Sequence, residues 1–476
     1  MKPEYRKRLL YVVVDYIAAN VGWGLFNAIR YFILSLERQG YESVSAYLQS
    51  FSVMAGQIFG PLAMMVVFYL SGYYNRVFMK SRAGVVLTTL GSIFIVSLIA
   101  FFTMLVNDLT SDRIVDYNLV GVLFFVLFFS IFIPRWILTR LTTASIVSGE
   151  ISFPTLVVGT SDDAEAMSRR IAVLQGSRGF RIVGYVNAGS HHISPVGVMS
   201  YTMDDIVDVC AENNVENIIL IPEESDSDAD SRNHLLEMVN RLFPLECAIY
   251  ISPSTAHFLT SRVRQTDITS EPLIDISRSD MSDSTVNMKR VSDVVVSAVV
   301  LLLISPLLAI LGLMVKMDSP GPAFYRQQRV GRHKKVFYIN KLRTMRIDAE
   351  SSGPSLSSEN DPRVTRLGRV LRKYRLDELP QFWNVLKGDM SLVGPRPERE
   401  YFLSRIVAKA PYYVLLLQVR PGITSWGMVK YGYAENVDEM IERSRYDLLY
   451  LENISFTVDM KILFHTVHTV LTGKGV

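Results

Sequence analysis

Long apolar stretches alternate with short polar segments over the first 140 residues. These stretches are residues 9–36, 51–69, 85–106 and 117–138. Each has about the 20 residues that a helix needs to cross a bilayer. A helix of a soluble bundle keeps a polar face, whereas residues 124–133 have none. The pattern therefore predicts four transmembrane helices within residues 1–140.

Basic residues gather on alternate segments that flank these stretches. They are Lys2, Arg6, Lys7 and Arg8 at the N-terminus, then Arg76, Lys80 and Arg82, and finally Arg135 and Arg140. Short loops rich in Lys and Arg stay on the cytoplasmic side of a membrane. We therefore expect the N-terminus and everything from residue 141 onward to be cytoplasmic.

Residues 150–265 show a different period. Short buried strands are expected at residues 155–159, 217–222 and 247–251, with helical patterns at 203–213 and 231–243. This alternation predicts a small parallel, Rossmann-like sheet. The first turn lacks the glycines of a dinucleotide site, and Asp162 and Asp163 would repel a pyrophosphate from the helix start. A structural, dimerising or regulatory module is the better interpretation. Residues 266–287 are polar and are expected to form a linker.

A fifth apolar stretch covers residues 291–315 and has Ser305-Pro306 at its centre. Proline removes a backbone hydrogen bond and kinks a helix. The stretch either spans the membrane or breaks at Ser305-Pro306 and returns as a re-entrant hairpin. Lys289 and Arg290 precede it, and residues 319–347 carry eight basic residues and no acid. Basic flanks at both ends favour the hairpin.

Composition agrees with a protein that lies partly in a membrane. Hydrophobic residues make up 49% of the 476 residues, and the charged share of 20% is below the usual quarter. The net charge of +3 gives no indication of nucleic acid binding. Cys210 and Cys247 lie in no cysteine or histidine cluster, so neither a zinc site nor a disulfide framework is expected.

The strongest candidate chemistry lies at Asp377-Glu378, directly after the basic, amphipathic residues 364–374. The two acids could simply begin a helix, because acids are favoured at its positive end. The basic run would attract phosphates and lower the carboxylate pKa values. A carboxylate is also a nucleophile in phosphoryl transfer, which needs a divalent cation. We therefore consider Asp377 a candidate nucleophile, and both acids candidate ligands for Mg²⁺.

A rigid turn, Gly394-Pro395-Arg396-Pro397, follows the acidic pair. The planar guanidinium of Arg396 could grip a phosphate or stack on a base. A plain surface turn is the alternative. His465 and His468 stand three residues apart in the last predicted helix, but no third metal ligand accompanies them.

Residues 288–476 resemble the bacterial sugar transferases, the monotopic polyprenol-phosphate phosphoglycosyl transferases. The resemblance rests on an ordered series of motifs. They are KRVSD at 289–293, Ser305-Pro306, SPGPAFY at 319–325, QRVG at 328–331, KLRTM at 341–345, the stretch 361–397 around the acidic pair, and RPGIT at 420–424. The four preceding helices and the Rossmann-like domain resemble the larger members, which initiate exopolysaccharide or O-antigen repeat units.

The resemblance implies a fold and a location. It implies a four-helix transmembrane bundle (residues 1–140), a degenerate Rossmann-like α/β domain (150–265) and a mainly α-helical monotopic catalytic domain (288–476) with a re-entrant helix. The protein would be a multi-pass protein of the bacterial inner membrane, with both of the latter domains on the cytoplasmic face. A homodimer is plausible for such a chain.

The resemblance also implies an activity and its residues. Such an enzyme transfers a sugar-1-phosphate from a UDP-sugar to undecaprenyl phosphate and releases UMP. Asp377 would be the nucleophile, and Glu378 would help to hold Mg²⁺ or handle a proton. The expected phosphate contacts are Lys341, Arg343, Arg372 and Arg375, and the expected nucleotide contacts are Pro395, Arg396 and Pro397.

Two other classes of function stay open. The chain could be a non-catalytic membrane scaffold, or a sensor that binds a nucleotide in its Rossmann-like module. It could also be a metal-dependent glycosyltransferase with an acidic DxD site at Asp226-Ser227-Asp228 or Asp228-Ala229-Asp230. No motif identifies the sugar.

Overall fold

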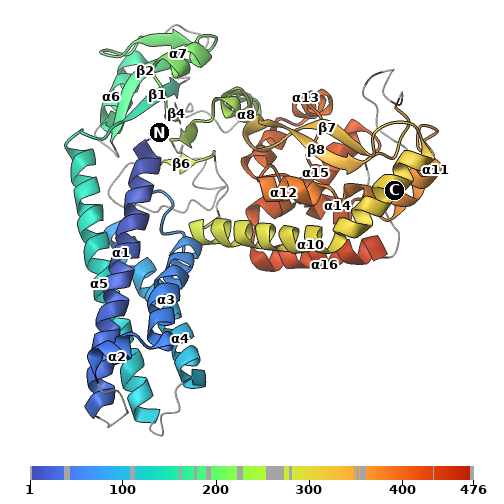
Figure 1. The fold of residues 1–476 in the computed structure, drawn as a ribbon. Helices are drawn as coiled ribbons and strands as arrows, with labels where there is room; N and C mark the ends of the chain where they lie inside the picture. Colours follow the sequence, from blue (N-terminus) through green and yellow to red (C-terminus); the bar gives the residue numbers. More distant parts are fainter. Residues whose placement is uncertain are drawn as a thin grey trace. The chain divides into compact units, whose positions relative to one another are not determined.

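The protein is described by a computed structural model that divides into two compact units, residues 1–152 with 282–288, and residues 153–281 with 289–476. Figure 1 shows the elements of each. The structure describes residues 3–36, 43–107, 113–159, 163–175, 179–188, 194–221, 229–252, 273–277, 281–347, 349, 353, 361–432 and 434–471.

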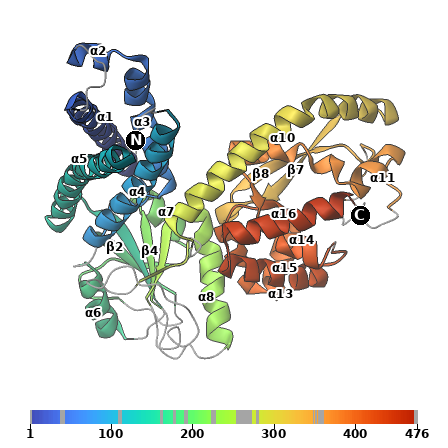
Figure 2. The same ribbon diagram turned by 90° about the horizontal axis from the view of Figure 1, so that it is seen from below.

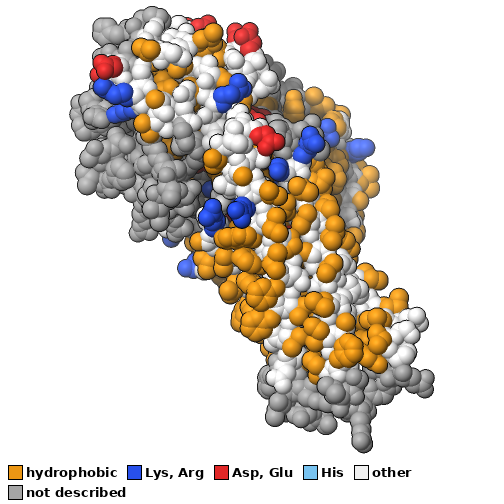
Figure 3. All heavy atoms as spheres, turned by 90° about the vertical axis from the view of Figure 1, so that its left-hand side faces the viewer, with side chains coloured by type: hydrophobic (Ala, Val, Ile, Leu, Met, Phe, Trp, Pro, Cys, Tyr) orange, Lys and Arg blue, Asp and Glu red, His pale blue; other side chains and the backbone are white. Residues whose placement is uncertain are grey.

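The first unit is helical. Its helices are α1 (Pro3–Leu36), α2 (Val44–Leu48), α3 (Phe51–Leu70), α4 (Arg82–Asn107) and α5 (Arg113–Val147). The four long helices include the four predicted apolar stretches. α1 packs on α3 and α5, and α4 packs on α5, while apolar side chains cover much of the outer surface (Figure 3). These four helices and α10 are long and apolar enough to cross a membrane.

A buried ion pair lies inside this unit. Arg135 is fully buried and donates to the Asp15 carboxylate, with its Nη2 atom 2.6 Å from Oδ2. It also donates to the Thr89 hydroxyl at 3.0 Å, and the Tyr74 hydroxyl donates to Asp15 at 2.9 Å. Arg135 therefore belongs to the helix core. It is not the free basic flank that the expected orientation counted.

The second unit contains a six-stranded sheet in the order β3-β2-β1-β4-β5-β6. Its strands are β1 (Phe153–Gly159), β2 (Phe180–Asn187), β3 (Ser200–Thr202), β4 (Asn217–Ile221), β5 (Ala248–Ile251) and β6 (Ile274–Asp275). All pairs are parallel except β5–β6. The expected linker therefore contributes an edge strand, because Ile274 pairs with Ile251.

Alternate strand residues build two cores, one on each face of this sheet. Val157 and Ile219 pack with α6 (Ala164–Gln175), whereas Leu156 and Ile218 pack with α7 (Ile206–Glu212) and α8 (Ala229–Leu242). Figure 2 shows α6 and α8 flanking the strands. The acidic DxD residues Asp226 and Asp228 lie outside the described residues, as does the start of the first sheet helix at Asp162.

Helix α10 (Asp283–Asp318) continues through Ser305 and Pro306, where a break was expected. Proline lacks the N–H that would bond the carbonyl of Leu302, four residues earlier. The Ser305 hydroxyl donates to that carbonyl at 2.9 Å, so the carbonyl is satisfied and the helix persists. Figure 1 shows α10 as one helix that bends along its length, not as two helices of a hairpin.

The rest of the second unit surrounds two short sheets. A hairpin is formed by β7 (Phe324–Val330) and β8 (Val336–Leu342), and β9 (Ser391–Val393) pairs in parallel with β10 (Gly422–Thr424). The accompanying helices are α11 (Arg366–Lys373), η3 (Leu376–Glu378), α12 (Gln381–Lys387), α13 (Glu400–Lys409), η4 (Pro411–Gln418), α14 (Trp426–Lys430), α15 (Val437–Glu452) and α16 (Phe456–Leu471). The hairpin, α12, β9, α15 and α16 share an apolar core.

Candidate active site

The acidic pair lies in the turn between α11 and α12. Arg375 has a left-handed backbone conformation (φ 51°), which ends α11 and starts the short helix η3 that carries Asp377 and Glu378. Pro380 occupies the N-cap of α12, and no side chain caps that helix. The two acids therefore do not act as its cap, which was the plainer interpretation of their position.

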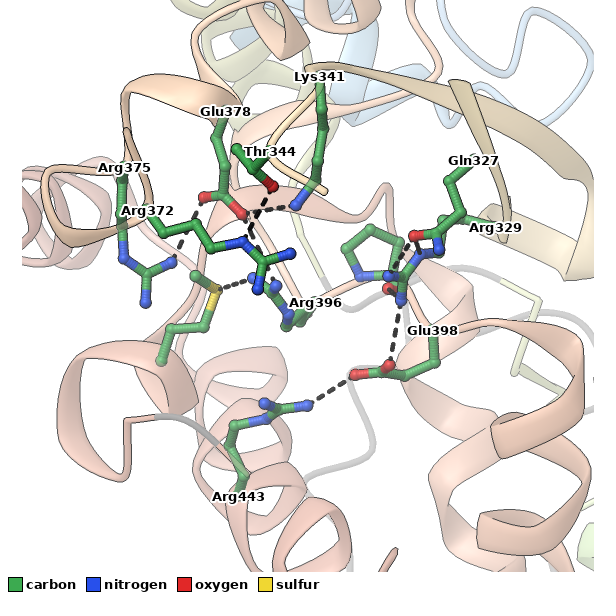
Figure 4. A network of polar contacts seen from close by, with 12 residues as sticks. Gln327, Arg329, Lys341, Thr344, Arg372, Arg375, Glu378, Arg396, Glu398 and Arg443 are labelled. Carbon is green, nitrogen blue, oxygen red and sulfur yellow. Dashed lines mark hydrogen bonds and ion pairs between the residues drawn. The ribbon is translucent and has the colours of Figure 1, made fainter. Parts of the chain in front are cut away.

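Glu378 is the centre of a cationic cluster. Its Oε1 atom lies 2.9 Å from Lys341 Nζ and 3.7 Å from Arg396 Nη2, and its Oε2 atom lies 3.3 Å from Arg375 Nη1. Figure 4 shows these three cations converging on the carboxylate from β8, from the turn before η3 and from the turn after β9. Burial alone would raise the pKa of Glu378, but the cations outweigh it and hold that pKa well below its usual range.

The environment of the Asp377 carboxylate differs from that of Glu378. Its side chain is buried, with 7% of the residue exposed, yet its carboxylate has no hydrogen-bond or ion-pair partner among the described residues. Burial raises the pKa of Asp377 to about 6; Lys341 opposes the rise and the Glu378 charge adds to it. At neutral pH the Glu378 carboxylate is thus held by cations, whereas the Asp377 carboxylate is ionised and has no such partner among the described residues.

Arg372 enters the same network from α11. Its Nε atom donates to the Thr344 hydroxyl at 2.9 Å. α11 approaches this strand end closely because Gly368 lies against it: a Cβ atom at Gly368 would stand 2.1 Å from the Thr344 carbonyl oxygen. The predicted residues Lys341, Arg372, Arg375 and Arg396 are therefore gathered around the acidic pair.

Arg343, the remaining expected phosphate contact, is not part of this cluster. Its guanidinium donates to the carbonyl oxygens of Ser319 and Pro320, each at 2.6 Å, and to that of Val315 at 3.3 Å. These carbonyls lie at the end of α10, so Arg343 caps that helix. Gly321 leaves room for it, since a Cβ there would stand 2.0 Å from Arg343 Nη1.

The turn with Pro395, Arg396 and Pro397 is held by the backbone. The Pro395 carbonyl accepts a hydrogen bond from Gly422 at 2.9 Å, and Gly394 N–H donates to Thr424 at 3.0 Å. Both glycines permit this close parallel contact, because a Cβ at Gly422 would stand 2.2 Å from Gly394 N. The turn is thus rigid. The motif RPGIT supplies β10, the strand that pairs with β9 just before the turn.

A buried ionic network that the sequence reasoning missed lies beneath this turn. Glu398 Oε1 accepts from Arg443 Nη2 at 2.6 Å, and Glu398 Oε2 lies 3.4 Å from Arg329 Nη1. The same Arg329 atom donates to the Pro397 carbonyl at 3.0 Å. Burial lowers the pKa of Arg329 to about 10. Glu398 directly follows Pro397 and could have been suspected, whereas nothing in the sequence around Arg443 indicates its role.

The donor set allows a magnesium ion at Asp377. Magnesium binds one or two carboxylates together with substrate phosphates and water. The free carboxylate of Asp377 suits this mode, whereas the oxygens of Glu378 are shared with cations. Within the described residues no group of three or more His, Cys, Asp or Glu side chains could hold a metal. A metal there would therefore depend on oxygen atoms of a bound phosphate.

These features define a protein with apolar, membrane-length helices and a basic, anion-attracting site around a buried acidic pair. The family described as "Bacterial sugar transferase" matches residues 284–473. The chain is 43% identical to UDP-glucose:undecaprenyl-phosphate glucose-1-phosphate transferase of Caulobacter vibrioides over 186 residues, 39% of this chain and 70% of the relative. The chain belongs to the bacterial sugar transferase family, as its motifs indicated.

Two other relatives show how far the similarity reaches. Over 188 residues the chain is 43% identical to UDP-N-acetylgalactosamine-undecaprenyl-phosphate N-acetylgalactosaminephosphotransferase of Aeromonas hydrophila, covering 40% of this chain and 44% of the relative. Over 302 residues it is 32% identical to UDP-glucose:undecaprenyl-phosphate glucose-1-phosphate transferase of Escherichia coli (strain K12), covering 62% and 63%. The matched regions span less than two thirds of both relatives. Five apolar helices and bacterial relatives together indicate a bacterial membrane protein.

Proposed function

We propose that this protein transfers a sugar-1-phosphate from a UDP-sugar to undecaprenyl phosphate. The names of its relatives supply both substrate classes. The observation that carries the proposal is the asymmetry of the acidic pair: Asp377 is buried without a partner, and Glu378 is held by Lys341, Arg375 and Arg396. A free carboxylate beside fixed cations is what nucleophilic attack on a phosphate diester requires.

The reaction has two displacements. A carboxylate oxygen of Asp377 attacks the phosphorus that bears the sugar, and the bond from that phosphorus to the bridging oxygen breaks, so UMP leaves. A phosphate oxygen of undecaprenyl phosphate then attacks the same phosphorus, and the bond to Asp377 breaks. The products are a diphosphate-linked sugar lipid, UMP and the original carboxylate, so no net proton is consumed.

The surrounding residues have separate tasks. Lys341, Arg372, Arg375 and Arg396 offset the charge of the diphosphate, and Arg396 on its rigid turn contacts the nucleotide. Magnesium held by Asp377 would supply further charge neutralisation at the phosphate oxygens. Glu378 keeps the cations in place. Because Glu378 is ionised and shared among three cations, we assign it positioning and not proton transfer.

The nucleophile is tested by substituting Asp377 in the full-length protein. Asp377→Asn is expected to abolish UMP release and to leave no labelled sugar-phosphate on the protein when the UDP-sugar is added without lipid. Lys387→Gln is the matched control, since Lys387 is exposed at the end of α12 and pairs with Asp389 alone among the described residues. Substantial turnover by Asp377→Asn would refute the assignment. The absence of UMP release by the wild-type protein would favour a scaffold.

We further propose that the bilayer is a partner of this protein. In this arrangement α1, α3, α4 and α5 span the inner membrane, and α10 enters it from the cytoplasmic face and returns at its bend. The exposed apolar residues of α10 support this, among them Leu302, Leu303 and Leu313. The strand order of the six-stranded sheet supports a Rossmann-like domain. We also propose that the protein forms a homodimer.

A further inference from the structure

The tip of the β7–β8 hairpin has an unfavourable backbone conformation. His333 and Lys334 both have positive φ values, 52° and 56°, and Lys335 N–H donates to the Arg332 carbonyl at 3.1 Å. This is the geometry of a type I′ turn, which strongly favours Asn-Gly at its two central positions. Residues with a Cβ are strained there. The strain persists only where surrounding contacts hold the turn.

The turn contacts η4 and also the residues Phe243–Leu245 that follow α8 in the sheet domain. His333 Nε2 donates to the Ser277 carbonyl at 2.8 Å, just beyond β6. Its ring centroid lies 5.8 Å from that of Phe243, which directly follows α8. Lys335 also pairs with Glu246 at 2.5 Å, but both side chains are exposed, and exposed pairs contribute little. His333 therefore supplies the partly buried side-chain contact between the tip and the sheet domain.

The two strands behind this tip carry site residues. Lys341 on β8 reaches Glu378, and Arg329 on β7 reaches the carbonyl of Pro397 and the Glu398 carboxylate. The backbone N–H of Val330 also donates to the backbone carbonyl of Glu398 at 2.9 Å. A two-stranded hairpin is marginally stable by itself, and several of its side chains are exposed. Its position thus depends on what holds it at each end.

We propose that the six-stranded sheet domain clamps the β7–β8 hairpin through His333, and that this clamp sets the positions of Lys341 and Arg329 at the acidic pair. His333 is then a positioning residue at the tip of the hairpin that carries Lys341 and Arg329. The inference rests on the proposed transferase function for its kinetic consequence, but not for its structural one. In this proposal the sheet domain supports the site structurally and does not need to bind a nucleotide.

The first test compares two substitutions in the full-length protein. His333→Ala removes the contact and keeps the strained backbone. We expect faster hydrogen–deuterium exchange across residues 324–342. We also expect a UMP release rate reduced about fivefold, the factor that corresponds to one lost hydrogen bond if its energy acts on the position of Lys341. The double variant His333→Asn with Lys334→Gly also lacks the imidazole, but its turn is unstrained. We expect its exchange to slow toward wild type, because the turn is no longer strained, whereas its rate stays reduced, because the hairpin is no longer held to the sheet domain.

Lys335→Met is the matched control, because it removes only the exposed ion pair of the same turn and should change neither readout. Unchanged exchange in His333→Ala would overturn the clamp. Faster exchange with an unchanged rate would overturn its positioning of the site. Full recovery of the rate in the Asn-Gly variant would also overturn positioning by the sheet domain. The exchange readout remains valid even if the wild-type protein releases no UMP, so the two proposals fail separately.

Discussion

The acid limb of the pH–rate profile depends on the charges around Asp377. The carboxylate attacks only when ionised, and its pKa is raised to about 6. Adduct formation should therefore fall about tenfold for each pH unit below about 6. Lys341 lowers this pKa and Glu378 raises it, so removal of each charge shifts the limb in opposite directions.

The expected magnitude comes from the usual effect of a neighbouring charge on a carboxylate pKa. A cation within a few ångströms of a carboxylate lowers its pKa by about 1–3 units, and Lys341 contacts Glu378 in the adjacent position. Lys341→Met should move the limb up by about 1 unit or more, whereas Glu378→Gln should move it down. Arg375 and Arg396 remain beside Glu378 in Lys341→Met, so Glu378 stays ionised there.

The assay should follow the first displacement alone. Undecaprenyl phosphate is a phosphate monoester, whose second pKa is also near 6, and it would mask the carboxylate. Single-turnover formation of UMP from UDP-sugar, without lipid and between pH 4.5 and 8, avoids that (these limits are roughly two units either side of the pKa). If both variants shifted the limb in the same direction, or if neither shifted it, Asp377 would not be the titrating nucleophile.

Three further predictions concern the packing of α11, the buried network around Glu398 and the position of α10 in the membrane. Gly368→Ala forces a Cβ against the backbone carbonyl of Thr344 and should destabilise the protein by about 1–3 kcal/mol, measured by denaturant unfolding of the purified protein. Glu398→Gln removes the negative charge that pairs with two buried arginines, Arg329 and Arg443. The variant should have lower thermal stability, and its KM for UDP-sugar should rise more than its kcat falls. Single cysteines at Ser282 and Asp318, before and at the end of α10, should both be labelled only by reagents that enter the cytoplasm.

Each of these has a control or a contradicting outcome. Gly312→Ala is the counterpart of Gly368→Ala, because its Cβ would stand an ordinary 3.7 Å from Ala323, and it should not destabilise. Equal unfolding midpoints for the two glycine variants would show that α11 can move away. An unchanged melting temperature in Glu398→Gln would mean that water reaches the network. Labelling of the two cysteines from opposite sides would mean that α10 spans the membrane.

The sequence predicted those elements whose signal is local. The four apolar stretches and the fifth at 291–315 needed only length and hydropathy, and all five lie in helices. Strand β4 was predicted almost to its ends because it is buried on both faces and reads as a continuous apolar run. The edge strands β3 and β6 were missed because three and two residues carry no period that a pattern can detect. Strand β2 was missed as well, although it has eight residues.

The site residues, too, were predicted only where the sequence carries a signal for them. Lys341, Arg372 and Arg375 were expected near the acidic pair from the family resemblance, and the fold brings them there. Arg343 stands two residues from Lys341 and has the same charge, yet it faces the end of α10, because alternate strand residues share a face only until the strand ends at Leu342. Arg443 lies about a hundred residues from Lys341 in the chain, and only tertiary contacts show its partner.

The unequal treatment of the two adjacent acids also has a consequence for chemical labelling. A diazo or epoxide reagent esterifies a carboxyl group most readily when that group is protonated and outside any ion pair. Near pH 5.5 a fraction of the Asp377 side chains meets both conditions, whereas Glu378, ionised and surrounded by cations, meets neither. The same contacts that reserve Asp377 for a phosphate would therefore direct a small, uridine-linked electrophile to one residue of the pair, and peptide mapping would identify which.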